Sequence, residues 1–110
     1  MRRRSLILAA PLLATPALAQ GWAPSRAIRL VAPYAPGGGV DTASRLLAVP
    51  MSAHLGQNVV VENRGGAGGS IGAAEVARAA PDGHTVMVDA MAHTVNPALM
   101  RGLPFDYATA

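Results

Sequence analysis

The stretch "LVAPYAPGGGVDTASRLL", Leu30 to Leu47, decides the fold, because it joins an apolar run to a helical pattern through three consecutive glycines. Glycine loses more backbone entropy on folding than any other residue. Three glycines in a row are therefore costly, unless the backbone turns sharply there or a ligand approaches it closely. The stretch predicts a strand, a glycine loop and a helix in immediate succession.

The same succession recurs further along the chain and predicts the order β-α-β-α-β. The short β-branched run "NVVVEN" is typical of a strand, and "RGGAGG" after it is a second glycine loop before an alanine-rich helix. Alternating strands and helices predict an α/β fold with an open, largely parallel sheet and right-handed crossovers. The predicted strands are 28–33, 58–63 and 84–90, and the predicted helices are 41–55, 70–80 and a short turn at 96–100.

The first predicted helix carries one apolar face and one local conflict. Its apolar residues recur every four positions, which places them on a single helical face. Pro50 removes an amide donor from the helix interior, so we expect a kink or a break there. The residues of the expected face are Ala43, Leu47, Met51 and Leu55.

The two glycine loops are the candidate ligand site. In open α/β sheets, ligands bind beyond the carboxyl ends of the strands, where loops lead into helix amino termini. These termini present free amides and a partial positive charge, which suit an anion. Ser70 stands where it is expected to cap the second helix. We therefore expect the loops to converge on one anion.

Nucleotides are a poor fit to these loops. A phosphate loop of the Walker type needs lysine after its last glycine, and the chain contains no lysine. The dinucleotide pattern G-x-G-x-x-G would require glycine at Thr42 or at Ile71, and neither position has one. A small carboxylate fits better, because neutral donors and helix ends suffice to bind it.

A serine hydrolase is the alternative from another class of protein. Gly68 to Gly72 match G-x-S-x-G around Ser70, and Asp89 followed by His93 has the chain order of an α/β-hydrolase triad. However, that motif needs serine on a tight strand-to-helix turn, and six residues separate the predicted strand from Ser70. Asp89 and His93 would also give only two metal ligands, so we expect no metal and no cofactor.

The amino terminus has the layout of a secretory signal peptide. Basic residues 2–4 precede an apolar run, Leu6 to Ala14, and a small-residue cleavage pattern that ends at Ala19. The pattern predicts a signal peptide over 1–19, cleavage before Gln20, and export by either the general or the twin-arginine route. The net charge of +3 comes from 9 basic and 6 acidic residues. Because three of the nine are Arg2 to Arg4, the mature part carries 6 minus 6, or zero, and nucleic acid is not an expected partner.

Several ordered segments resemble one family closely. They are "IRLVAPYAPGGGVDTASRLLA", "LGQNVVVENRGGAGGSIGAAEVARAAPDGHTVM", "HTVNPAL" and "LPFDY", and together they cover nearly all of Ser25 to Tyr107. They are similar to the amino-terminal third of the substrate-binding proteins of tripartite tricarboxylate transporters, the Bug-type receptors. The resemblance implies a periplasmic receptor of two α/β lobes, of the type II-like kind, that closes on a small carboxylate and delivers it to the membrane subunits of the transporter.

The resemblance also implies the ligand-binding residues and the extent of the domain. Residues 20–110 would be a partial amino-terminal lobe, with the second lobe absent, and a full-length receptor is expected to be a monomer. A chain that ends at Ala110 could instead be a non-functional fragment. The residues that match the family's ligand loops are Tyr34, Ala35, Pro36, Gly37, Gly38, Gly39 and Asp41, then Gly66, Ala67, Gly68, Gly69 and Ser70, and finally His93 and Thr94.

Overall fold

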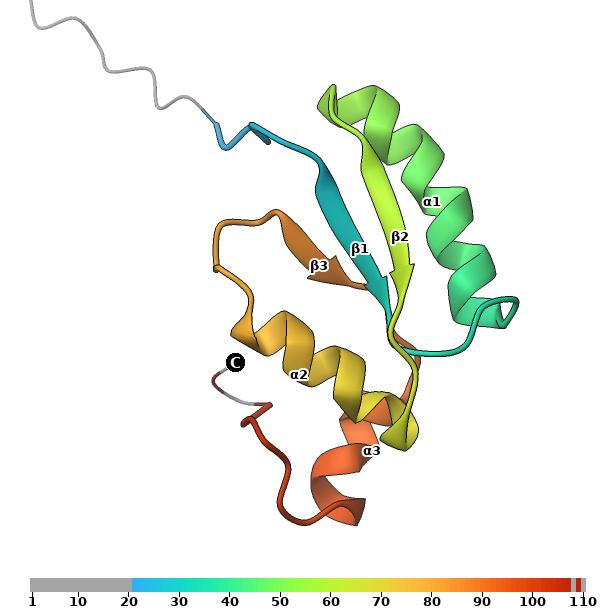
Figure 1. The fold of residues 1–110 in the computed structure, drawn as a ribbon, viewed down its shortest axis with the longest axis vertical. Coiled ribbons are helices and arrows are strands. Elements are labelled where there is room, and N and C mark those ends of the chain that lie inside the picture. The colour runs from blue at the N-terminus through green and yellow to red at the C-terminus, as the bar shows by residue number, and fades with distance from the viewer. Residues whose placement is uncertain (1–20, 108, 110) are drawn as a thin grey trace, which may run out of the picture.

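The computed structural model describes residues 21–107 and 109. The predicted signal peptide lies outside these residues. Among the described residues, none of the helices combines the length and apolar character needed to cross a membrane. The elements, in order, are β1 (Ile28–Ala32), α1 (Gly39–Leu55), β2 (Val59–Asn63), the 3-10 turn η1 (Ala67–Gly69), α2 (Ser70–Arg78), β3 (Thr85–Met87) and α3 (Ala92–Leu99) (Figure 1).

The three strands form one parallel sheet with the order β2-β1-β3. Leu30, in the central strand, is paired with Val61 on one side and with Val86 on the other. All three strands point the same way, toward the part of the molecule where α2 begins and α3 lies (Figure 1). The predicted α/β class and the β-α-β-α-β order are confirmed.

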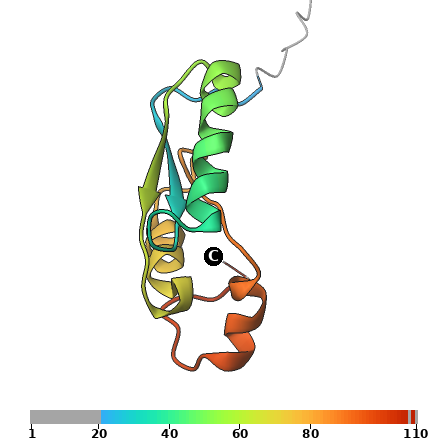
Figure 2. The same cartoon turned by 90° about the vertical axis from the view of Figure 1, so that its right-hand side faces the viewer.

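The core is built around β1, which is buried on both faces. Ile28, Leu30, Val31 and Ala32 are each at most 2% exposed. Successive side chains of a strand point to opposite faces, so helices must cover both sides of this one. Helix α1 packs on β1 and β2 along one side of the sheet, and α2 packs on β1 and β3 (Figure 2).

The buried face of helix α1 differs from the predicted one. Its buried residues are Asp41, Ser44 and Ala48, whereas Ala43 and Leu47 are exposed. The expected apolar face was therefore wrong for these two residues, whereas Met51 and Leu55 are half-buried. The fully buried side chains of the helix are small or polar. The buried Ser44 hydroxyl is satisfied because it donates a hydrogen bond to the Val40 carbonyl at 2.7 Å.

Pro50 does not break α1, which is continuous from Gly39 to Leu55. Proline leaves the carbonyl four residues earlier without its amide donor. Here that residue is Leu46, which is 72% exposed, and Pro50 is exposed as well. Water can therefore replace the missing donor, and the helix continues through a residue that would interrupt it in the core.

The third strand and the third helix also differ from their predicted ranges. Strand β3 has three residues rather than the seven of 84–90. Helix α3 begins at Ala92, four residues before the predicted turn. As a result His93 and Thr94, which were expected in a loop, lie in the first turn of a helix.

The segment that precedes β1 is fastened to the turn before β3. The Trp22 indole donates to the Asp82 carbonyl at 3.0 Å, and the Ser25 amide donates to His84 Nε2 at 3.1 Å. Arg26 forms an ion pair with Asp82 at 2.8 Å. These contacts hold the amino ends of β1 and β3 together, so that their carboxyl ends present the loops side by side.

Candidate functional site

The glycine run Gly37 to Gly39, which leads from the loop into α1, contains one glycine that the backbone requires and two that it does not. Gly37 has a φ of +86°, in the left-handed region that favours glycine. Gly38 has a φ of −79°, and a Cβ there would meet only the Ala35 oxygen, at 3.6 Å. A Cβ at Gly39 would meet nothing within 4 Å. The absence of these two side chains leaves open space beside the backbone.

That open space lies at the amino terminus of α1. The N-cap is Gly38, whose carbonyl accepts the Thr42 amide at 2.9 Å and whose position provides no side-chain cap. The first amides of a helix have no partner within the helix. Together with the helix dipole they favour a bound anion, which the two small residues allow to approach.

Asp41 supports this loop from within. Its carboxylate accepts hydrogen bonds from the Gly37 amide at 2.9 Å and the Asn63 side chain at 3.0 Å, and it pairs with Arg45 at 3.1 Å. The Gly37 amide, followed by Arg45 and Asn63, lowers the pKa of Asp41 to about 2. Because the carboxylate is only 5% exposed and has these partners, it holds the loop rather than facing a ligand.

The second loop needs its glycines for its own geometry. Gly66, Ala67, Gly68 and Gly69 all have positive φ, at 126°, 47°, 62° and 87°. A Cβ at Gly66 would lie 2.6 Å from the Ile71 side chain. This succession of left-handed residues wraps the chain tightly into η1 before α2 starts.

The two loops lie next to each other. A Cβ at Gly65 would lie 3.2 Å from the backbone of both Tyr34 and Ala35. A Cβ at Gly69 would lie 3.2 Å from His93 Nε2 and 3.4 Å from the Tyr34 ring. The structure thus brings together residues from the first loop, the second loop and α3.

Asp89, which follows β3, joins the first loop to α3. The Tyr34 hydroxyl donates to its carboxylate at 2.8 Å, and the His93 amide donates to the same group at 3.4 Å. Burial, with the hydrogen bond to Asp89, raises the pKa of Tyr34 to about 12. The Tyr34 proton therefore stays in place at any physiological pH.

The remaining predicted residue of this region, Thr94, lies at the surface. Its hydroxyl donates to the Met91 carbonyl at 2.6 Å, which stabilises the first turn of α3. Unlike His93, Thr94 is exposed.

Ser70 is not the helix cap that the sequence predicted. The N-cap of α2 is Gly69, and Ser70 is the first helical residue. Its hydroxyl donates to the Ala67 carbonyl at 2.8 Å, because the 3-10 turn places that carbonyl directly behind it. The ring nitrogens of His93 face Tyr107 and Asp89 instead of this hydroxyl, so the geometry of a hydrolase triad is not formed.

Outside the loops, the described residues form no metal centre, and the apolar groove beside α2 does not suit an anion. No group of three or more potential ligands occurs among residues 21–107 and 109. A groove of about 300 Å³ lies between α2, β3 and the segment with Phe105 and Tyr107. Its lining carries no charged side chain and is mainly aliphatic, so it does not suit a carboxylate.

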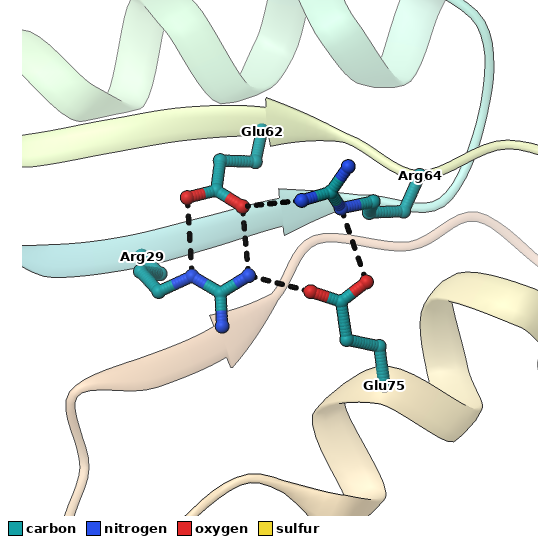
Figure 3. Close-up of polar contacts among 4 residues, drawn as sticks. All are labelled: Arg29, Glu62, Arg64 and Glu75. Atoms are coloured by element: carbon teal, nitrogen blue, oxygen red, sulfur yellow. Dashed lines mark hydrogen bonds and ion pairs between the residues drawn. The ribbon is translucent and has the colours of Figure 1, made fainter.

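A network of four charged residues fixes the second loop to the sheet and to α2 (Figure 3). Arg29 in β1 contacts Glu62 at 2.7 Å and Glu75 at 2.5 Å, and Arg64 contacts Glu75 at 3.0 Å. The hydrogen bonds to Glu62 and Glu75 raise the pKa of Arg29. Because Arg64 begins the second loop, the network fixes the point from which that loop departs.

Two residues near the site were missed by the sequence analysis. Asn96 is 4% exposed, and its side chain donates to the Gly68 carbonyl at 3.1 Å. The Tyr107 hydroxyl lies 2.6 Å from His93 Nδ1. Asn96 stood in a predicted helical turn and Tyr107 in a segment without a predicted element, so no local pattern distinguished them.

Comparisons with known proteins identify the family of this chain. Residues 43–110 match the family described as "Tripartite tricarboxylate transporter family receptor". A relative from Agrobacterium vitis, described as a UPF0065 protein in the TAR-I ttuE-ttuC' intergenic region, is 49% identical over 84 residues, which are 76% of this chain and 24% of that protein. The chain thus spans about a quarter of the length of this curated relative.

Solved structures show the same fold in longer proteins. A protein described as a periplasmic transporter is 53% identical, with a TM-score of 0.72 over 76% of this chain and 28% of its own. The malate-bound MatC protein of Rhodopseudomonas palustris is 43% identical, with a TM-score of 0.70 over 74% and 28%. An R. palustris protein with adipate is 37% identical, with a TM-score of 0.73 over 78% and 29%.

These matches reject the hydrolase alternative, because the family and its solved members are solute-binding receptors. The α/β sheet corresponds to part of one lobe of those receptors. This chain belongs to the receptor family of tripartite tricarboxylate transporters.

Proposed function

We propose that this chain forms the amino-terminal part of one lobe of an exported receptor, which binds a small carboxylate and delivers it to the membrane subunits of a tripartite tricarboxylate transporter. Residues 1–19 are the proposed signal peptide and residues 20–110 the proposed partial lobe. A periplasmic location is supported by the description of a structural relative as a periplasmic transporter. The full-length receptor is proposed to act as a monomer.

The observation that carries this proposal is the open space at Gly38 and Gly39. Neither residue has the positive φ that would explain glycine by backbone conformation alone. Their missing side chains expose the first amides of α1, and the second loop touches the first at Gly65. We expect the first amides of α1, together with donors of the adjacent second loop, to bind one carboxylate group.

The charges of the site favour a carboxylate that is bound by neutral donors. Asp41 is the one charged side chain that the proposed ligand residues contribute, and Gly37, Arg45 and Asn63 already compensate it. Relatives of this fold contain malate and adipate, which differ in length but share terminal carboxylates. We therefore propose a di- or tricarboxylate as the ligand class, with the residues of the two loops, His93 and Thr94 around one end.

The affinity expected for the 110-residue chain follows from the free energies of the interactions that its loops can offer. Micromolar binding requires about 8 kcal/mol. One helix amino terminus contributes roughly 0.3 to 1 kcal/mol, and each hydrogen bond to a charged group about 1.5 to 3 kcal/mol before ordering costs are subtracted. Loops on a single lobe leave the ligand open to water, so we expect a millimolar dissociation constant for this chain.

The test is a titration of the isotopically labelled chain with malate and adipate, followed by NMR, with the corresponding diamides as uncharged controls. We expect the dicarboxylates to shift the amide signals of 37–42 and 66–70, and the diamides to leave them unchanged. Equal shifts for the diamides, or shifts confined to the apolar groove beside Phe105, would disprove a carboxylate site. Sequencing of the exported protein tests the signal peptide, because the mature chain should begin at Gln20.

A further inference from the structure

Tyr107 contacts α3 from a segment that follows it by eight residues. Its hydroxyl lies 2.6 Å from His93 Nδ1 and 3.4 Å from Asn96 Nδ2. Its ring is 5.3 Å from the His93 ring and packs edge-on against Phe105 at 4.7 Å. One phenol therefore contacts two buried polar side chains of the same helix.

The directions of these hydrogen bonds follow from the donors available. An amide Nδ2 can only donate, so the Tyr107 oxygen accepts from Asn96. The single phenolic proton then has one partner left, which is His93 Nδ1. If Nδ1 carried a proton instead, the Tyr107 proton would face no acceptor among these partners. Every hydrogen atom among these partners is therefore paired only if Tyr107 donates to Nδ1, with the ring proton of a neutral His93 on Nε2.

The opposite side of the His93 ring leads to the same tautomer. Asp89 Oδ1 lies 3.5 Å from Nε2, too far for a good hydrogen bond but close enough for charge to matter. A carboxylate oxygen can only accept, so it favours a proton on Nε2 over a lone pair. Within the part of the chain that the structure describes, Nε2 is buried without a hydrogen-bonded partner.

The same contacts reach both glycine loops. Asp89 accepts the Tyr34 hydroxyl from the first loop at 2.8 Å. Asn96 has two amide protons, and besides Tyr107 it contacts the Gly68 carbonyl of the second loop at 3.1 Å. The Tyr107 hydroxyl is thus linked to the first loop through His93 and Asp89, and to the second loop through Asn96.

We propose that Tyr107 is a positioning residue of the candidate site, which holds His93 with its proton on Nε2 and thereby orients Asp89, Tyr34 and the Gly68 turn. Its effect on ligand affinity rests on the function proposed above. The hydroxyl, rather than the ring, performs this role. Phe105, in the same segment, packs on the ring but forms no part of the hydrogen-bonded chain.

The test is long-range ¹H–¹⁵N NMR of the histidine side chains in the 110-residue chain at neutral pH. We expect His93 to be protonated on Nε2, with a hydrogen-bonded Nδ1. In Tyr107→Phe the Nδ1 signal should move toward the position of an unbonded nitrogen, whereas in the control Phe105→Leu it should not. A wild-type His93 that carries its proton on Nδ1, or an Nδ1 signal unchanged in Tyr107→Phe, would overturn the assignment.

Malate affinity separates positioning from packing. Loss of one hydrogen bond should weaken binding about two- to tenfold. Tyr107→Phe and Tyr107→Leu should be weakened alike if the hydroxyl matters, whereas a packing role would spare Tyr107→Phe and contradict the proposal. If circular dichroism shows that Tyr107→Phe does not fold, the His93 tautomer measured in the wild type still tests the proposed role of Tyr107. If the wild type binds no dicarboxylate, the proposed function fails, and the tautomer measurement still decides this inference.

Discussion

The buried carboxylate of Asp41 accepts a hydrogen bond from the backbone amide of Gly37 at 2.9 Å, across the loop that opens the candidate site. Asn63, at the end of β2, donates to the same carboxylate at 3.0 Å. One side chain thus fixes the turn at the positive φ of Gly37 and ties it to the neighbouring strand. The first loop is held in shape before any ligand arrives.

This relationship predicts how stability depends on pH. The pKa of Asp41 is lowered to about 2 from an ordinary value of 3.8, so its contribution is complete above about pH 4 and is lost as the pH falls toward 2. Thermal melts across this range should show the loss. In Asp41→Asn the loss should be smaller, because that side chain no longer titrates. An unchanged acid dependence in Asp41→Asn would contradict the role of this carboxylate.

The four-residue network in Figure 3 predicts a second effect on stability. Glu75→Gln removes the charge that both Arg29 and Arg64 contact, at 2.5 and 3.0 Å. Partly exposed ion pairs contribute little individually, so we expect a loss of about 1 kcal/mol in the free energy of unfolding. Chemical denaturation measures it, with Arg101→Gln as the exposed control. Equal stability of the two variants would show that the network does not hold α2 to the sheet.

The contact between Trp22 and Gly83 can be tested by fluorescence, because Trp22 is the only tryptophan in the chain. A Cβ at Gly83 would lie 2.8 Å from the indole, whereas one at Gly102 would meet nothing within 4 Å. Both glycines have positive φ, so each change to alanine costs about 1 kcal/mol of backbone strain. Gly83→Ala should also shift the Trp22 emission to the red and increase its quenching by acrylamide.

Gly102→Ala is the matched control for that displacement. It carries the same kind of backbone strain without a neighbour, so its Trp22 emission should equal that of the wild type. If the two variants gave the same emission, the amino-terminal segment would not be docked on the turn before β3.

The order of strands and helices was predictable because it depends on local patterns. The β-branched run of β2 and the apolar run of β1 are strand patterns in any context, and the turns between elements follow from glycine and proline. The buried face of α1 was not predictable from apolar spacing. Its sheet contact uses Ser44 and Ala48, while the larger Leu47 remains exposed. Close packing of the helix on the sheet leaves room for small side chains at this contact and not for large apolar ones.

The candidate site was predictable only in part, for a related reason. The glycine loops could be recognised in the sequence. Their proximity follows because parallel strands end at the same edge of the sheet. The roles of individual residues depend on partners far along the chain. The Ser70 hydroxyl turns back to Ala67 because of a 3-10 turn that the glycine pattern did not specify. Tyr107 reaches His93 across fourteen positions, and no periodicity encodes such a contact.

The proposed function requires that Gly38 is small so that a carboxylate can reach the amides of α1. The most direct measurement compares malate affinity, by NMR titration, in the wild type, Gly38→Val and Gly21→Val. A Cβ at Gly21 meets nothing within 4 Å and one at Gly38 meets only the Ala35 oxygen at 3.6 Å, and neither glycine has a positive φ, so both positions have room for a larger side chain. We expect that Gly38→Val stays folded and loses binding, while Gly21→Val binds as the wild type does. Wild-type affinity in Gly38→Val would contradict a carboxylate site at the amides of α1.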